Sequence, residues 1–177
     1  PARLSAISDR LIATGLDMAL HQYDAPLVER EQLLGAHDGA YIDEIYAAAP
    51  TDGIRWVDGD TAMNKHSLQA ALRAAGAVIM GVDLVMQGKA TKVFCGVRPP
   101  GHHAERHKAM GFCFFNNVAI GAYHALNAYG LHRIAIVDFD VHHGNGTEEI
   151  VSGDERVLFC STFQHPFYPH SGFDSTA

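Results

Sequence analysis

Cysteine is scarce in this sequence, and the few cysteines follow no recognisable spacing. Three occur among 177 residues, namely Cys95, Cys113 and Cys160. An odd and scattered set argues against both a disulfide framework and a cysteine-based metal site. Each cysteine lies beside apolar residues, so we expect buried free thiols in a reducing compartment.

Basic residues are outnumbered, and long uninterrupted apolar runs are lacking. The 13 lysines and arginines face 20 acidic residues, for a formal net charge of -7, which excludes nucleic-acid binding through a broad cationic face. We expect no membrane span and find no secretory leader, so the expected location is cytoplasmic, with neither nucleic acid nor a membrane as partner.

The composition that remains is that of a folded globular chain. Hydrophobic residues make up 47% and charged residues 19% of the sequence, enough for a sizeable core. The length predicts a single domain over residues 1–177. Pro1 stands just ahead of a helical pattern and Ala177 shortly after a predicted strand, so we expect a domain truncated at both ends.

The hydrophobic pattern alternates between helical and strand periodicity. It predicts helices over residues 2–14, in short pieces within 26–49, over 67–88 with Ser67 as the N-cap, and over 115–129 and 148–151. It predicts buried strands over residues 92–97, 133–140 and 156–162, and a surface loop over 50–65. This alternation indicates an α/β fold with a mostly parallel sheet covered by helices on both faces.

Ionisable residues gather where the predicted strands end. His102 and His103 follow the first strand, residues 138–145 close the second, and Ser161 and Thr162 end the third. Ligands of such sheets bind beyond the carboxyl ends of the strands, so we expect these three loops to form one site.

The segment 138–146 has the residues that a bound cation requires. Asp138, Asp140 and His142 recur at every second position, so in an extended chain they share one face. Carboxylate oxygen and imidazole nitrogen suit a hard or borderline cation. If only Asp140 and His142 are ligands, a third must come from elsewhere. The alternative is that the aspartates cap the next helix and the histidines are ordinary loop residues.

The tandem His102–His103 pair is suited to proton transfer, because imidazole titrates near neutral pH. Asp138 would raise the basicity of one ring, and Asn145 could orient the other without adding charge. In the alternative interpretation the two histidines have no catalytic role.

Aromatic residues follow the histidine loop and could form a channel wall or simply pack in the core. We expect Phe112 in the wall, and Phe114 and Phe115 in the core. Two other sites are excluded. No lysine follows Gly144-Asn145-Gly146 as in a phosphate loop, and no serine sits on a Gly-x-Ser-x-Gly elbow.

Three ordered motifs, at residues 98–104 (RPPGHHA), 111–117 (GFCFFNN) and 138–146 (DFDVHHGNG), resemble the histone deacetylase superfamily. The resemblance is to the N-terminal portion of the class II-like enzymes, including bacterial histone deacetylase-like amidohydrolases and acetylpolyamine amidohydrolases. It implies an arginase–deacetylase-like three-layer α/β fold, incomplete in this chain. It also implies zinc-dependent hydrolysis of an acetylated amine, either acetyl-lysine peptide or acetylpolyamine, to acetate and free amine.

By this resemblance Asp140 and His142 match two of three zinc ligands. His103 matches the general base that activates water and then protonates the leaving amine. His102 matches its electrostatic partner, and Asp138 the carboxylate bonded to His102. Asn145 stands where class I members carry aspartate. The structural potassium ion of the family would lie at Asp138, Asp140, His142 and Ser161.

The substrate contacts implied by the resemblance are the Gly111 carbonyl and an acyl-lysine tunnel walled by Phe112 and Tyr168. The third zinc ligand, an aspartate, and a carbonyl-polarising tyrosine or histidine lie downstream of these motifs in the family, so we expect the fragment alone to be inactive. Two alternatives stay open: a non-catalytic module that binds an acetylated amine or a partner, and a manganese hydrolase of arginase type. The exact substrate is also open, and a homo-oligomer is possible.

Overall fold

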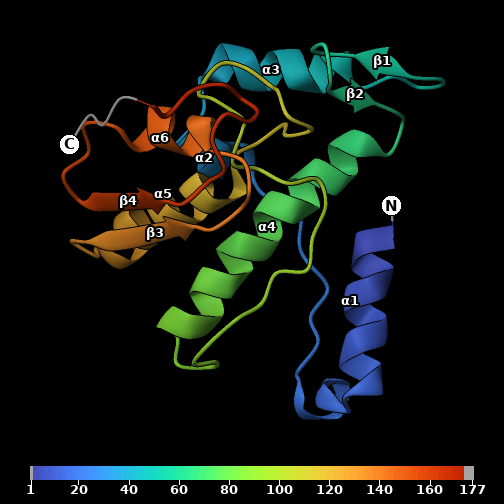
Figure 1. The fold of residues 1–177 in the computed structure, drawn as a ribbon. Coiled ribbons are helices and arrows are strands. Elements are labelled where there is room, and N and C mark those ends of the chain that lie inside the picture. Colours follow the sequence, from blue (N-terminus) through green and yellow to red (C-terminus); the bar gives the residue numbers. More distant parts are fainter. Residues whose placement is uncertain (1, 174–177) are drawn as a thin grey trace.

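The computed structural model describes residues 2–173 as an α/β arrangement (Figure 1). In chain order the elements are α1 (Ala2–Ala13), the 3-10 helix η1 (Leu16–Ala19), α2 (Arg30–Leu33), α3 (Gly39–Ala48), β1 (Arg55–Trp56), β2 (Ala62–Met63), α4 (Ser67–Met86), α5 (Asn117–Tyr129), β3 (Ile134–Asp138), α6 (Asn145–Val151) and β4 (Val157–Ser161).

The parallel pair β3–β4 positions the site. Its register runs from Ile134 opposite Val157 to Asp138 opposite Ser161, and α6 is the crossover helix between the strands. Parallel strands need such a crossover connection. Their carboxyl ends therefore meet at one edge, which confirms that residues after 138 and after 161 come together.

The core lies between the inner face of this pair and the helices α3, α4 and α5. Leu33, Ile42, Phe115 and Ile120 are fully buried there. Helices α4 and α5 pack closely because Gly121 carries no side chain: a Cβ at this position would lie 2.4 Å from Cγ1 of Val78. Helix α1 has no buried residue and lies apart from the body in Figure 1.

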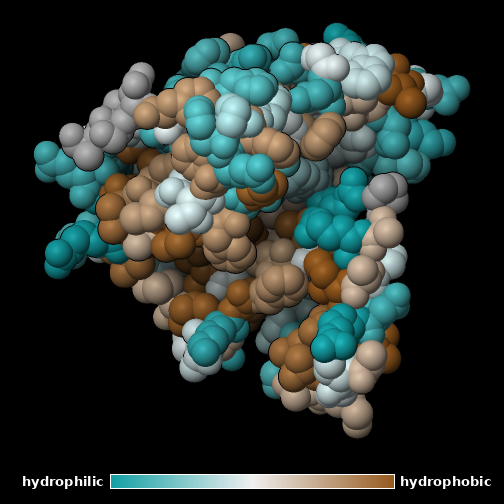
Figure 2. All heavy atoms as spheres, viewed as in Figure 1, coloured by the Kyte–Doolittle hydropathy of each residue, from teal (hydrophilic) through white to brown (hydrophobic). Residues whose placement is uncertain are grey.

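The outer face of β3–β4 carries apolar side chains exposed to solvent, and we call it the open sheet face. Val137 and Leu158 are 65% and 62% exposed, and Phe139, just beyond β3, is 87% exposed. Figure 2 shows apolar residues gathered around this region and along the lower parts of α4 and α1. Within residues 2–173 helices cover one face of the pair, so the expected cover on both faces is not found there.

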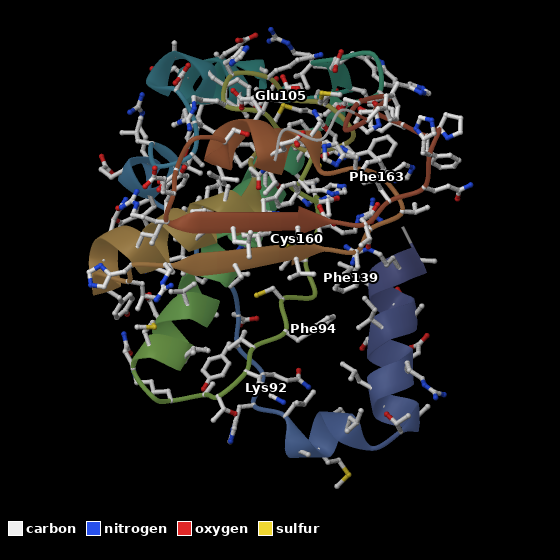
Figure 3. The ribbon with its side chains drawn as sticks, turned by 60° about the vertical axis from the view of Figure 1, so that its left-hand side comes forward. Lys92, Phe94, Glu105, Phe139, Cys160 and Phe163 are labelled. Carbon is white, nitrogen blue, oxygen red and sulfur yellow. The ribbon has the colours of Figure 1, made fainter. Side chains whose placement is uncertain are left out.

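The prediction of a strand over residues 92–97 is wrong. Within residues 2–173 this segment has no regular secondary structure and forms no ladder, and Phe94 is 73% exposed. Its alternate residues nevertheless pack on α4, where a Cβ at Gly81 would lie 3.2 Å from Val93 and 3.5 Å from Cys95. A strand requires a hydrogen-bonded neighbour as well as an apolar pattern, and the described residues provide none. Figure 3 shows Phe94 on this segment and Phe139 below the strand pair.

The prediction of a surface loop over residues 50–65 is also wrong in part. It contains the antiparallel hairpin β1–β2, in which Thr61 and Met63 are fully buried. Ser67 is the first residue of α4 and not its N-cap, which is His66; the Ser67 hydroxyl instead accepts a hydrogen bond from the Asn64 N–H. Helix α5 begins at Asn117, two residues later than predicted, with Asn116 as its N-cap, and it ends at Tyr129 before its C-cap Gly130, as predicted.

Two expectations from composition also need correction. Helix α4 is long and apolar enough, by length and composition, to cross a membrane, but half of its most apolar window is buried in the protein. Core helices share this composition, because one that packs on several sides is hydrophobic around much of its surface. Among the cysteines, only Cys113 is buried; Cys95 is half-buried, and Cys160 is exposed on the open sheet face because strand side chains alternate.

Candidate functional site

The histidine loop and the start of α6 are in direct contact. Gly146 allows this approach, because a Cβ there would lie 2.2 Å from the Ala104 carbonyl oxygen. The Thr147 N–H donates to the His102 carbonyl oxygen at 3.1 Å. The structure thus brings together the two motifs that the sequence separates by more than thirty residues.

His102 is held by the carboxylate at the end of β3. Its Nδ1 lies 2.9 Å from Oδ2 of Asp138, and both side chains are largely buried. Burial alone would raise the pKa of Asp138, but the hydrogen bonds from His102 and from the Asp140 N–H together lower it below its usual value. Asp138 is therefore an anion that accepts the Nδ1 proton of His102.

His103 is held by a neutral partner. Its Nδ1 lies 2.8 Å from Oδ1 of Asn145, while Nδ2 of Asn145 donates to Oε1 of Glu105 at 2.9 Å. A carboxylate can only accept, so Glu105 fixes which end of the Asn145 amide faces the ring. Nδ1 of His103 must then carry the proton, which leaves Nε2 with a free lone pair.

The environment of His103 favours the neutral ring. The two tandem rings contact each other at a tilt of 44°, with their centroids 4.0 Å apart. Burial, followed by the proximity of His102, lowers the pKa of His103 to about 4. A buried neutral imidazole with Nε2 unprotonated can take up a proton from a bound group.

Asp140 and His142 lie together beyond the end of β3. Nδ1 of His142 is 3.2 Å from Oδ1 of Asp140, and the His142 ring centroid is 5.9 Å from that of His103. The oxygen and nitrogen donors of this half-exposed pair fit two positions of a zinc site. Asp138 is occupied by His102, so two-carboxylate ligation is not supported. Within residues 2–173 no third His, Cys, Asp or Glu side chain completes a metal-binding group.

The idea that the aspartates cap the next helix is wrong, because the N-cap of α6 is Gly144.

The residues predicted to bind potassium lie near the ends of β3 and β4. Ser161 lies opposite Asp138 in the sheet register, and its hydroxyl is 3.4 Å from Nδ1 of His143. Nε2 of His143 lies 2.8 Å from Oε2 of Glu148, so this buried ring ties α6 to the end of β4.

Two of the three predicted channel residues contact His103. Gly111 touches its ring, because a Cβ there would lie 2.4 Å from Cδ2 of His103. The Tyr168 ring stands edge-on at a centroid distance of 4.9 Å. Its hydroxyl is buried without a hydrogen-bond partner among the described residues. Burial and the nearby Asp60 charge raise the pKa of Tyr168. Phe112 is 65% exposed, and Phe114 and Phe115 are core residues as predicted.

Several residues of the site were not identified from sequence. Glu105 orients Asn145, and Phe167 stacks on His142 at 5.3 Å. Asp60 and Thr61 accept hydrogen bonds from the Gly111 and Phe112 N–H groups across about fifty residues of sequence. The aspartates within residues 50–65 give only a weak sequence signal for Asp60 and Thr61, since no local pattern marks either residue as a contact of the site.

Comparison with known proteins identifies the family. The model of the histone deacetylase domain matches residues 1–177. Type-2 histone deacetylase 1 of Dictyostelium discoideum is 51% identical over 130 residues, covering 69% of this chain and 9% of the relative. Polyamine deacetylase HDAC10 of Mus musculus is 38% identical over 192 aligned positions, covering 99% of this chain and 28% of the relative.

The crystal structure of the HDA15 HD domain superposes with a TM-score of 0.92 at 36% sequence identity, covering 97% of this chain and 49% of that one. The match confirms the arginase–deacetylase-like α/β fold, which is partial here. The chain spans about half of the matched structure and smaller shares of the two relatives. Motifs, fold and family model agree, and the chain belongs to the histone deacetylase family.

Proposed function

We propose that the protein carrying this chain is a zinc-dependent deacetylase, which hydrolyses the amide of an acetylated amine. The single observation that carries the proposal is the buried His103, whose Nε2 is free and which lies beside the Asp140–His142 pair. Membership of a family whose relatives are named deacetylases supports the reaction class.

Each residue has a distinct task in this reaction. Asp140 and His142 would hold zinc with a third ligand from outside the described residues; when bound, the ion polarises the amide carbonyl and acidifies water. His103 takes the proton from the attacking water at Nε2 as oxygen bonds to the carbonyl carbon. It then gives that proton to the amine nitrogen as the C–N bond breaks, releasing acetate and free amine.

His102 and Asp138 stabilise the protonated state of His103. The ring of His102 lies against that of His103 at a tilt of 44°, and the Asp138 anion, bonded to Nδ1 of His102, balances the positive charge that His103 gains. Asn145 keeps Nδ1 of His103 protonated throughout, so only Nε2 exchanges protons with the substrate.

The walls suit an extended aliphatic amine. Phe112 and Tyr168 would flank the approach to His103, supported by the Tyr168 ring 4.9 Å from that of His103 and by the exposure of Phe112, and the Gly111 carbonyl would accept a hydrogen bond from the substrate amide. Acetyl-lysine peptide and acetylpolyamine share this chemistry, and the two relatives are named for histone and for polyamine deacetylation.

We extend the proposal to a structural potassium ion at the corner formed by Asp138, Asp140, His142 and Ser161, supported by the register that sets Asp138 opposite Ser161. The three free thiols support a reducing, cytoplasmic location.

Acetate release by the complete polypeptide tests the proposal, with an acetyl-lysine peptide and an acetylpolyamine as substrates. We expect a chelator to abolish turnover and added zinc to restore it. His103→Ala should lower turnover by roughly 10²–10⁴-fold, the usual scale for a general acid–base group. His132→Ala is the matched control, because His132 is exposed before the opposite end of β3.

The alternatives predict different results. Activity that survives chelation, or an unchanged rate in His103→Ala, would refute the mechanism. Binding of the acetylated amine without acetate release would instead support a non-catalytic module. Two manganese ions per site by metal analysis would support the arginase-type hydrolase.

A further inference from the structure

The turn that carries the predicted entrance wall has an unusual backbone. The Cys113 N–H donates to the Met110 carbonyl oxygen at 2.9 Å, and the two residues between them, Gly111 and Phe112, have φ of +57° and +66°. Positive φ at both central positions is the hallmark of a type I′ turn, which favours glycine, asparagine and aspartate. Phenylalanine is bulky and rarely adopts this conformation, so surrounding contacts must enforce it.

Both outward-facing N–H groups of this turn are bound by two adjacent side chains. The Gly111 N–H donates to Oδ1 of Asp60 at 2.9 Å, and the Phe112 N–H donates to Oγ1 of Thr61 at 3.0 Å. The Thr61 hydroxyl in turn donates to Oδ1 of Asp60 at 2.7 Å. Burial would raise the pKa of Asp60, but hydrogen bonds from Thr61 and Gly111 bring it below its usual value, so the acceptor is a carboxylate.

These two residues sit on a firmly anchored element. The Val57 N–H donates to the Thr61 carbonyl oxygen at 2.9 Å, which closes the β1–β2 hairpin. Thr61 and Met63 are both fully buried. The pair can therefore impose a geometry on the turn, because the hairpin itself is fixed by the core.

The other side of the turn rests on the catalytic histidine. Gly111 leaves no room for a side chain against His103, so the turn is confined between the His103 ring and the hairpin. Its position thereby sets where the exposed Phe112 ring stands relative to His103.

We propose that Asp60 and Thr61 are positioning residues that hold the Gly111–Phe112 turn in its left-handed conformation and so set the width of the substrate channel. The channel itself rests on the proposed function. Loss of the Thr61 acceptor leaves the Phe112 N–H unpaired next to a strained backbone, and the turn relaxes toward negative φ. The Phe112 ring then moves away from the approach to His103.

Hydrogen exchange measures this directly and without any substrate. The complete polypeptide, selectively labelled with ¹⁵N-phenylalanine and ¹⁵N-glycine, is followed by NMR in deuterated buffer. In Thr61→Val, which keeps the side-chain shape but lacks the hydroxyl, the Phe112 amide should exchange about tenfold faster. Thr61→Ser restores the acceptor and should restore protection. Asp60→Ala should accelerate the Gly111 amide in the same way.

Kinetics on the same variants separate the positioning role of Asp60 and Thr61 from the proposed function. We expect Thr61→Val to raise KM for the acetyl-lysine peptide about 3- to 10-fold with a smaller change in kcat, and Thr61→Ser to restore KM. Unchanged exchange in both Thr61→Val and Asp60→Ala would overturn the proposal. Accelerated exchange together with absent deacetylation in every variant, wild type included, would uphold the positioning role while refuting the proposed function.

Discussion

At the scale of single residues, the site depends on partners that decide protonation states. Asp138 and Asn145 both bind Nδ1 of a histidine, but one is an anion and the other is neutral. The residue types alone leave open which ring each partner binds, and the family resemblance implies the Asp138–His102 pair that the structure contains. The sequence does not predict Glu105, since its role is to orient Asn145 and only the folded geometry reveals that contact.

Buried His37 makes stability depend on pH. Its Nε2 accepts the Asn116 N–H at 2.9 Å, its side chain is 1% exposed, and burial lowers its pKa from 6.5 to about 4. Between these values the unfolded chain binds a proton at His37 that the folded chain excludes. The stabilisation is therefore complete above pH 6.5 and is lost as the pH falls toward 4.

We expect this group to reduce the free energy of unfolding by about 2 kcal/mol between pH 7.5 and pH 5. Urea denaturation gives the free energy of unfolding of wild type and His37→Gln at both pH values. Subtracting the pH-dependent change of the variant from that of wild type removes the contribution of other titrating groups. His132→Gln, at an exposed position, serves as control. If the free energy of unfolding falls equally in wild type and His37→Gln between pH 7.5 and pH 5, His37 is not responsible for the pH dependence.

At the scale of elements, helices were predicted better than strands. The apolar periodicity of α1, α4 and α5 is local, so the sequence reveals it directly. The 92–97 segment has a similarly clear apolar run, but strand formation depends on a distant partner that the run cannot reveal. The β1–β2 hairpin was missed for the opposite reason, because its strands are two residues long and surrounded by turn residues.

The contact between α4 and α5 makes Gly121 intolerant of a side chain. A Cβ there would lie 2.4 Å from Cγ1 of Val78, whose branched side chain has little rotamer freedom to move away. Gly121→Ala should therefore destabilise the protein by about 1–3 kcal/mol, although alanine favours helix more than glycine does.

A double-mutant cycle with Val78→Ala tests this explanation by chemical denaturation. Val78→Ala removes the methyl group that clashes, so adding Gly121→Ala to that variant should cost much less than adding it to wild type. If the cost is the same in both backgrounds, the clash with Val78 is not the cause.

At the scale of the whole molecule, the fold class and the sheet edge that carries the candidate site were predictable, but the uncovered face of the strand pair was not. The carboxyl ends of parallel strands meet at one edge, and this rule correctly brings the residues after 138 beside those after 161. Residues 102–103 join them through the contact of the histidine loop with α6, since no strand precedes that loop within the described residues. No such rule indicates which face of β3–β4 stays uncovered, because a strand buried on both faces and one buried on a single face can carry the same apolar run.

The open sheet face predicts how residues 1–177 behave when expressed on their own. Val137, Phe139 and Leu158 form a contiguous apolar surface of a kind that soluble monomers rarely expose. We expect this chain to bind the dye ANS strongly and to self-associate, measured by fluorescence and by sedimentation velocity. The double substitution Val137→Thr and Phe139→Gln should weaken both effects. Met18→Gln is the matched control, because Met18 is 90% exposed on η1, away from this face, and should leave both unchanged. Equal effects of the two changes would mean that general surface hydrophobicity, and not the open sheet face, drives association.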